Sequence, residues 1–380
     1  MYKLISSLKN SLSRRPALRR YVLFATVPAT AFVAVAVALS LPARPDTVQV
    51  AQKFRVLATV PLQSNAQNSV AVNQALNKIY TSGGPSNVDH HVTVIDGTFP
   101  QPTPTPTPWD VGNGSNVTVD NKTNRYWATT VYDGSVIVRD GTSNAVIATV
   151  PIPPTGVCPI DLTYDFKYNR VWVGAQCGGF NDPVIPIDAT TFQVITPPGP
   201  IGLGCVMGAV GANGVNGRLY ENQSDGSHCQ LITLRVDPIT FAHTTTAFGF
   251  VQAFNPVTNK LYAVPAGTRN LQIINGAPDP EVILKTITLP YDPGNMAVNP
   301  ALNALYIANP AGNSLEVRDP DTGALINIFS PLPATPSGPV AVDSIRGRIY
   351  VISNSPSPSV LMVIEDLTNA FKPGAIISHF

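Results

Sequence analysis

Hydrophobic and polar residues alternate over short stretches of this chain, and the same alternation returns at intervals. In Asn299–Asn309, an Asn-Pro turn precedes a short apolar run, and a small polar turn then leads to a second alternating stretch, Ser314–Asp319. Apolar residues with a period of two, bounded by Asn, Pro and Gly, predict β-strands joined by tight turns. We therefore expect this segment to form a β-hairpin.

The hairpin pattern recurs seven times, each copy with an aromatic residue in a strand that follows an Asn- or Gly-containing turn. Successive aromatics are separated by 46, 46, 48, 42, 44 and 44 residues. A period of about 40–50 residues holding four short strands is typical of β-propeller blades. The sequence therefore predicts an all-β fold, a seven-bladed β-propeller of four-stranded antiparallel blades. We expect the repeated aromatics to be buried between blades. They are Tyr80, Tyr126, Trp172, Tyr220, Tyr262, Tyr306 and Tyr350.

The clearest copies of the pattern are Asn255–Tyr262 and Val92–Asp96. They resemble the YVTN-type β-propeller repeat, a WD40-like repeat that runs roughly V-N-P-x-T-N-x-x-Y-V-x-N and then V-x-V-I-D. The resemblance covers about Val48 to Asn369 and implies an exported, bacterial-type seven-bladed propeller. It implies little about activity, because function lives in sites grafted onto a fold.

The N-terminal stretch has the features of a targeting segment. Met1–Arg20 holds six basic residues and no acid, and Tyr21–Leu41 is 21 residues without a charge. Such a run is either a removable export signal or an apolar helix that anchors the chain in a membrane. We therefore expect residues 1–43 to be an export signal or anchor, and residues 48–380 to form the propeller in the periplasm or outside the cell. Ser13–Arg19 resembles the twin-arginine export motif.

Charge argues against a nucleic-acid partner. The chain has 24 basic and 23 acidic residues, and six of the basic ones precede Arg44, so 18 − 23 leaves a net charge of −5 in the remainder. A nucleic-acid-binding protein needs a basic surface. We expect a protein or cell-surface ligand, and a monomer that is either free or tethered to the membrane through residues 21–41.

Two segments bear on how the ring is completed. Arg55–Leu62 nearly repeats Val146–Ile152, which is expected to be the outermost strand of the second blade. We expect this N-terminal strand to complete the last blade and close the ring, the alternative being an isolated edge strand. Pro100–Trp109 has proline at alternate positions. It is interpreted as an extended spacer that replaces an outer strand, the alternative being a recognition or glycosylation segment.

The four cysteines all fall in the third and fourth blades. Cys158 and Cys177 flank the first two strands of one blade, and Cys205 and Cys229 hold comparable places in the next. In an exported chain this arrangement predicts two local disulfides, Cys158–Cys177 and Cys205–Cys229. A metal site is the alternative, and the absence of a C-x-x-C motif weakens it.

The rim where the innermost strands begin is the natural place for a propeller ligand. Aligning the repeats places seven residues at equivalent rim positions: Ser69, Asn116, Asp161, Ala209, Val251, Asn295 and Pro339. Asp161, Asn116 and Asn295 could ligate a divalent ion through oxygen, in a ring that resembles the metal site of lactone-hydrolysing propellers. The alternative is that these polar groups, with Ser69, cap strand ends, so no metal site is assigned.

Catalytic groups do not converge in the sequence. No nucleophile-elbow, phosphate-loop, zinc-protease or haem-attachment motif is present. Asp182, Glu221 and Asp225 are expected in loops that could fold over the channel. The histidines are scattered: His90, His91, His228, His243 and His379.

The sequence thus favours a non-enzymatic binding or scaffold propeller, without an assigned catalytic residue or cofactor. The competing hypothesis is a metal-dependent lactonase or lyase at the channel mouth. A third is a surface-layer or adhesion component, for which the Pro-Thr segment gives mild support.

Overall fold

The computed structural model describes residues 53–62, 67–83, 91–98, 107–110, 114–154, 157–176, 184–199, 201, 205–224, 231–355 and 358–369. The chain divides into two compact units, Met1–Ala51 and Gln52–Phe380, and every described residue lies in the second. The expected N-terminal helix and leader therefore lie outside the described residues. Within the described ranges, no helix is long and apolar enough to cross a bilayer.

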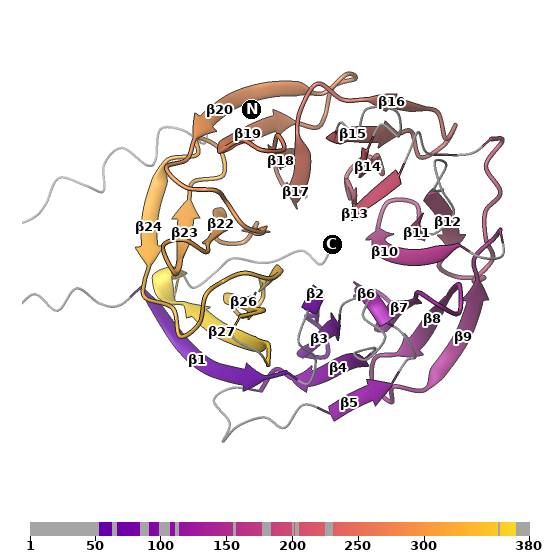
Figure 1. The fold of residues 1–380 in the computed structure, drawn as a ribbon, viewed down its shortest axis with the longest axis horizontal. Helices are drawn as coiled ribbons and strands as arrows, with labels where there is room; N and C mark the ends of the chain where they lie inside the picture. The colour runs from indigo at the N-terminus through magenta and orange to yellow at the C-terminus, as the bar shows by residue number, and fades with distance from the viewer. Residues whose placement is uncertain are drawn as a thin grey trace, which may run out of the picture. The chain divides into compact units, whose positions relative to one another are not determined.

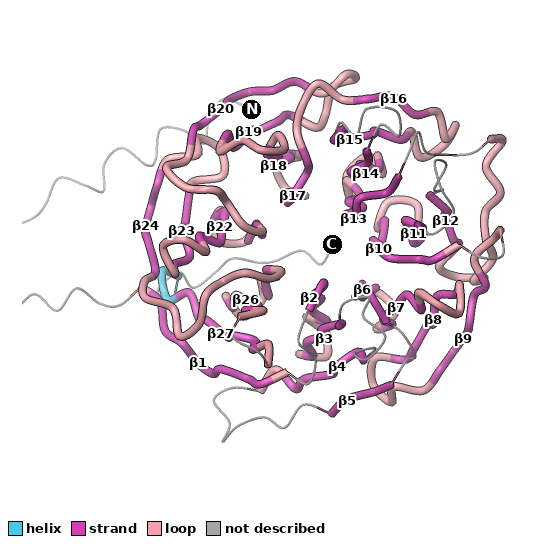
Figure 2. The backbone as a smooth tube through the Cα atoms, viewed as in Figure 1, coloured by secondary structure: helices cyan, strands magenta, loops and turns pink. Residues whose placement is uncertain are grey.

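The described residues of the second unit form seven antiparallel sheets in a seven-bladed β-propeller arrangement, which confirms the predicted fold class (Figure 1). In each sheet the strand order runs outward from an inner strand, and a short turn joins that inner strand to the second strand (Figure 2).

The first four blades, from the inner strand outward, comprise β2 (Gln67–Asn73), β3 (Lys78–Gly83), β4 (His91–Asp96) and β5 (Thr107–Asp110); β6 (Gly114–Asp120), β7 (Arg125–Thr130), β8 (Ser135–Asp140) and β9 (Val146–Pro151); β10 (Cys158–Asp165), β11 (Arg170–Gln176) and β12 (Val184–Asp188); and β13 (Cys205–Ala212), β14 (Leu219–Ser224), β15 (Leu231–Val236) and β16 (His243–Thr245). The last three comprise β17 (Phe250–Asn255), β18 (Lys260–Val264), β19 (Asn270–Asn275) and β20 (Val282–Thr288); β21 (Met296–Asn299), β22 (Ala304–Asn309), β23 (Ser314–Arg318) and β24 (Leu325–Phe329); and β25 (Val340–Asp343), β26 (Arg348–Ser353), β27 (Val360–Asp366) and β1 (Phe54–Pro61). A short 3₁₀ helix, η1 (Leu367–Asn369), follows β27.

Blade three departs from the expected four strands. Its described sheet ends at β12, and beyond it only a single bridge joins Ile187 to Val194. Pro197 and Pro198 follow this bridge. Proline lacks the N–H that a ladder needs, so the outer strand cannot continue there.

The Pro-Thr segment ends in a strand, so its interpretation as a spacer in place of an outer strand is wrong at its C-terminal end. In β5, Thr107 to Asp110 pair with Val94 to His91 of β4. Proline is tolerated on an edge strand, where its nitrogen can face away from the ladder. The residues before Thr107 in this segment lie outside the described residues.

Blade seven combines strands from both ends of the described chain. β1 pairs with β27 from Phe54 opposite Asp366 to Pro61 opposite Val360. Phe54 and Val60 are buried, and the Phe54 ring lies 5.6 Å from that of Phe329 in blade six.

A two-part turn follows every inner strand and explains why the repeat is visible in the sequence. The strand ends in Asn or Asp, or in blade four is followed directly by Asn213. The side chain of this residue accepts backbone N–H groups two or three residues ahead; Asp343 accepts from Ile345 and Arg346, both at 3.0 Å. The turn then ends in a left-handed residue, Asn or Gly, as at Asn259 (φ 51°) and Gly347 (φ 63°). The Asn and Asp residues are Asn73, Asp120, Asp165, Asn213, Asn255, Asn299 and Asp343. We call this end of the propeller the turn face and the opposite end, where the inner strands begin, the mouth face.

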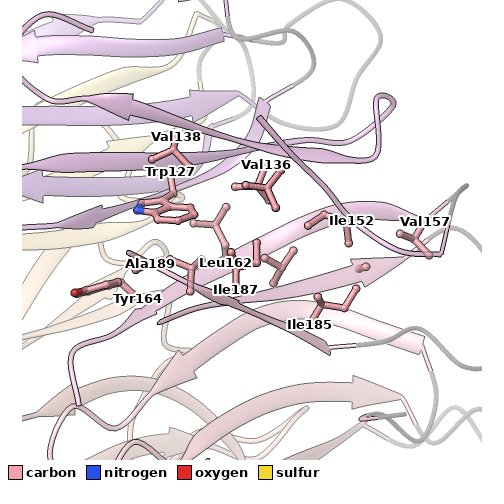
Figure 3. Close-up of a cluster of buried hydrophobic side chains, with 14 residues drawn as sticks. Trp127, Val136, Val138, Ile152, Val157, Leu162, Tyr164, Ile185, Ile187 and Ala189 are labelled. Carbon is pink, nitrogen blue, oxygen red and sulfur yellow. The ribbon is translucent and has the colours of Figure 1, made fainter. Parts of the chain in front are cut away.

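The repeated aromatics are fully buried, but the sequence pattern predicted the wrong aromatic residue for blade two. In blade two the pairing register places Trp127, rather than Tyr126, opposite the third strand where Tyr80 stands in blade one. Tyr126 and Trp127 are adjacent in the sequence, so the repeat pattern alone does not show which of them is equivalent to Tyr80. Trp127 packs with Val138, Leu162 and other side chains of blades two and three (Figure 3).

A basic residue two positions before most of these aromatics ties its blade to the next. Arg170 donates to the carbonyl of Pro238 in blade four at 2.8 Å and lies against the rings of Trp172 and Phe241. Lys78 likewise donates to Gly141 of blade two at 2.6 Å. Arg348 of blade seven donates to the carbonyl of Gly97 in blade one. Hydrogen bonds therefore reinforce the apolar contacts between blades.

We expect the turns after the third strands to contribute to acid sensitivity. Hydrogen bonds from the backbone N–H and hydroxyl of Ser143 lower the pKa of Asp140 below its ordinary value of 3.8. A lowered folded-state pKa adds stability above about pH 4 that is lost as the pH falls through that pKa. Asp140→Asn keeps an acceptor oxygen but cannot titrate. Urea unfolding at about pH 5 and about pH 3 should show a smaller stability loss in this variant, and an equal loss would contradict the assignment.

Candidate ligand-binding site at the mouth face

The pairing register places the seven candidate rim residues equivalently. Each lies two residues before the partner of its blade's buried aromatic; for example, Trp172 pairs with Thr163, and Asp161 lies two residues earlier. The same offset relates Asn295 to Ala297, the partner of Tyr306. The polar members of the set, however, form hydrogen bonds to neighbouring blades.

Asp161 and Asn116 bond to each other across the interface between blades two and three. The amide nitrogen of Asn116 donates to Oδ1 of Asp161 at 2.5 Å, and the same oxygen accepts the backbone N–H of Leu162 at 2.7 Å. The backbone N–H of Asn116 donates to the hydroxyl of Thr129 at 2.9 Å. Asp161 is only 6% exposed. This carboxylate is therefore part of a buried contact between blades.

Ser69 and Asn295 also connect neighbouring blades. The Ser69 hydroxyl donates to the carbonyl of Val117 at 2.9 Å and accepts the Val117 N–H at 3.1 Å, which joins blades one and two. The Asn295 amide donates to the carbonyl of Gly338 at 3.1 Å, which joins blades six and seven. Within the described ranges, no group of three or more His, Cys, Asp or Glu side chains is placed to hold a metal ion.

We expect Asp161→Ala to lower the free energy of unfolding by about 1–3 kcal/mol, because the buried N–H of Leu162 and the amide of Asn116 lose their acceptor. Asp161→Asn is the matched control, since it keeps an acceptor oxygen and should cost less. Urea unfolding monitored by circular dichroism would measure both. Equal stability of wild type and Asp161→Ala would show that the contact contributes nothing.

An open groove lies on the mouth face between blades five and six. Its volume is about 580 Å³, and it is bounded by the loop after β18 and the connection before β21. Its polar side chains are those of Gln252, Thr268, Asp292 and Asn295, and Phe250 adds an aromatic side chain. The groove thus combines neutral hydrogen-bonding groups with a small apolar surface.

Asp292 is the one carboxylate that lines this groove, and an arginine accompanies it. Arg269 donates to its two oxygens at 2.8 and 3.3 Å, and this hydrogen bonding lowers the pKa of Asp292. Both side chains are more than half exposed. A carboxylate paired in this way stays ionised at neutral pH and is poorly suited to act as a general base.

Sequence reasoning identified only Asn295 among these lining residues. Gln252 lies on inner strand β17, whereas Thr268 and Asp292 come from two separate connections. The clue available in the sequence was the pair of Pro- and Gly-containing loops, Pro265–Gly267 and Pro293–Gly294, which predict exposed turns but not their proximity.

A second groove, of about 560 Å³, lies at the periphery between β9 and the Thr191–Val194 segment of blade three. It adjoins the incomplete outer edge of that blade and has a largely aliphatic lining, including Val150 and Ile152. It offers fewer hydrogen-bonding side chains than the mouth groove.

The remaining candidates are placed as follows. Glu221 was expected in a loop over the channel, which is wrong: it lies in β14 and is fully buried. Asp182 and Asp225 lie outside the described residues. Of the histidines, His91 opens β4 and His243 opens β16, while His90, His228 and His379 lie outside the described residues.

Two cysteines open inner strands at the mouth face. Cys158 pairs in register with Gln176, the residue before Cys177, and Cys205 pairs with Ser224. Cys177 and Cys229 lie outside the described residues, so the two disulfides stay a prediction.

The fold defines the class of protein, a seven-bladed β-propeller. No protein-family model matches this chain, and no curated protein is similar to it. The resemblance to the YVTN-type repeat therefore rests on the residues of the repeat alone.

Proposed function

We propose that this chain is an exported, non-enzymatic propeller of the YVTN type that binds a protein or cell-surface ligand at its mouth face. The observation that carries the proposal is that the polar groups on that face fall into two sets with different surroundings. Asp161 and Asn116 bond across a blade interface, whereas Gln252 and Thr268 line an open groove. The polar side chains that stabilise the contacts between blades are thus largely separate from those that can bind a ligand.

The lining suits a ligand with many neutral hydrogen-bonding groups. Amide and hydroxyl side chains pair with peptide groups or sugar hydroxyls, and Phe250 can pack against an apolar face of the ligand. The Asp292–Arg269 pair contributes one charge of each sign. We therefore favour an extended peptide or a glycan chain over a strongly charged ligand.

The alternative is a metal-dependent lactonase or lyase. Such an enzyme needs oxygen ligands, usually two or more of them carboxylates, that converge on one ion. Asp161 is the one acid among the seven aligned rim residues, and its Oδ1 already accepts two hydrogen bonds. This arrangement favours binding over hydrolysis.

Export and disulfides belong to the same proposal. Residues 21–41 act as a cleaved signal or a retained anchor, and the oxidising compartment outside allows Cys158–Cys177 and Cys205–Cys229 to form. The register supports the first of these pairs, because Cys158 lies opposite the residue before Cys177. Peptide mapping without reduction should recover these two pairs. A Cys177–Cys205 link or four free thiols would contradict the assignment.

The test of binding is a screen of the full chain on peptide and glycan arrays. Ala266→Trp places a bulky side chain at the groove, and Val257→Trp places the same side chain on the turn face of the same blade. We expect binding that is lost in Ala266→Trp and kept in Val257→Trp. Binding that both variants retain would move the site away from this groove, and no binding to any array would count against the proposal.

A further inference from the structure

Exposed aliphatic side chains gather on the outer strands of blades five and six. Strands β20 and β24 are the outermost of their sheets and are neighbours on the periphery of the propeller (Figure 1). The turn before β24 touches β20: Nζ of Lys285 donates to the carbonyl of Thr322 at 2.6 Å, and Gly323 lies directly against the side chain of Ile287. Six large aliphatic side chains on the two strands are between 37% and 52% exposed, and we call them the outer apolar surface: Val282, Ile283, Leu284, Leu325, Ile326 and Ile328. Single exposed apolar residues are ordinary, but a group of them marks an interaction surface.

A β-bulge in each strand contributes to this exposure. The pairing of β20 with β19 passes over Leu284, and the pairing of β24 with β23 passes over Ile326. A bulge leaves its extra residue unpaired and redirects the side chain. In both strands the residue that the bulge leaves unpaired is aliphatic and exposed.

The outer apolar surface has almost no charge. Residues 322–342, which include β24, contain no acidic or basic residue, and β20 contains Lys285 alone. Exposed edge strands usually carry charged residues or proline, which prevent association with other chains. β24 has neither between Leu325 and Phe329, whereas β9, which is also uncharged, contains Pro151. β24 is therefore an edge strand without these protections.

This composition restricts what can cover the surface. A strongly charged partner, or a layer of anionic headgroups, would find only one opposite charge, that of Lys285. The same surface on a second copy of the chain is equally apolar and uncharged. A two-fold axis places identical surfaces against each other, so that one contact covers both of them.

The size of the surface limits the strength of this contact. β20 and β24 contribute seven and five residues. A stable interface uses about 20–30 residues and about 800 Å² on each side. With the turns at the strand ends included, the contact falls at the small end of this range. We therefore expect a reversible dimer with a dissociation constant in the micromolar range.

We propose that the outer apolar surface of one chain packs against the same surface of a second chain about a two-fold axis. None of the residues that line the mouth groove belongs to β20 or β24. The dimer thus has two mouth grooves that the contact does not use. Two linked grooves would bind a repetitive peptide or glycan with avidity. This consequence for ligand binding rests on the proposed function, whereas the dimer itself does not.

Sedimentation equilibrium of the full chain over a range of concentrations would measure the dimer. Ile328→Lys places a charge from each copy in the apolar contact, where it loses water without gaining a partner, and should raise the dissociation constant by at least about tenfold. Ile147→Lys is the matched control, since it makes the same change on the exposed outer strand of blade two, and it should leave the constant unchanged. Circular dichroism would check that both variants are folded.

Hydrogen exchange of the unsubstituted chain locates the contact without any substitution. We expect the amides of Leu325–Phe329 to exchange more slowly at high than at low protein concentration, and those of Val146–Pro151 to be unaffected. A chain that sediments as the monomer expected from the sequence at every concentration would overturn the proposal. A dimer that Ile328→Lys does not weaken would also overturn it, because such a dimer uses another part of the chain.

The same exchange measurement distinguishes two other occupants of the surface. Protection of Leu325–Phe329 at every concentration that is lost on removal of Gly374–Phe380 would overturn the dimer and assign the surface to the chain's own C-terminal segment. Protection that appears only when liposomes are added would overturn it in favour of a lipid surface.

Discussion

Removing Phe54–Leu62 is expected to lower the unfolding free energy of the propeller by about 5–9 kcal/mol. Phe54, Val60 and Leu62 are each at most 3% exposed, and fully burying such a side chain is worth about 1.5–3 kcal/mol. The deletion also leaves the edge of β27 without its ladder partner. We propose on this basis that β1 closes the ring. Because domains are stable by only about 5–15 kcal/mol, thermal and urea unfolding should show the loss clearly.

Two controls isolate the strand. Val60→Asp buries a charge, whereas Thr59→Asp puts the same charge on an exposed position one residue away, so only the first should destabilise strongly. Trimming Gly374–Phe380 should matter less. An unchanged melting temperature after deletion of β1 would show that other contacts between blades seven and one are sufficient, such as the hydrogen bonds of Asn354 with Gln67 at 3.0 Å.

Trp172→Ala is expected to cost about 3–5 kcal/mol, the usual range for truncating a buried aromatic residue. Trp172 is fully buried between blades three and four and supports Arg170, which spans the same interface. The variant would leave both a cavity and a loosened Arg170. Phe166→Ala removes an exposed aromatic residue from the same blade and should cost less than about 1 kcal/mol. Urea unfolding that gives equal losses for the two variants would contradict this account of the interface.

The fold could be predicted from sequence because its turns are locally encoded. Asp or Asn at the end of an inner strand and a left-handed Asn or Gly before the next are specified by short-range chemistry, and Asn255 and Asn259 show both in one copy. The errors arose where local signals were ambiguous. Tyr126 and Trp127 are adjacent aromatics, and the prolines before β5 hid an edge strand that depends on pairing with β4.

The candidate site was less predictable, because its parts come from distant segments. The register of Asp161 and Asn116 followed from the repeat, but their mutual hydrogen bond depends on how two blades face each other. The mouth groove brings Gln252 together with Asp292, 40 residues later, and no periodicity links the two positions.

The measurement that most directly tests a binding propeller against a metal-dependent enzyme is calorimetric titration of calcium or zinc into the metal-stripped full chain. The rim acid Asp161 accepts hydrogen bonds from Asn116 and Leu162, so we expect no saturable binding in the micromolar range. The same titration of Asp161→Asn should give an indistinguishable result. Micromolar binding by the wild type that is lost in Asp161→Asn would contradict the account and favour a lactonase or lyase.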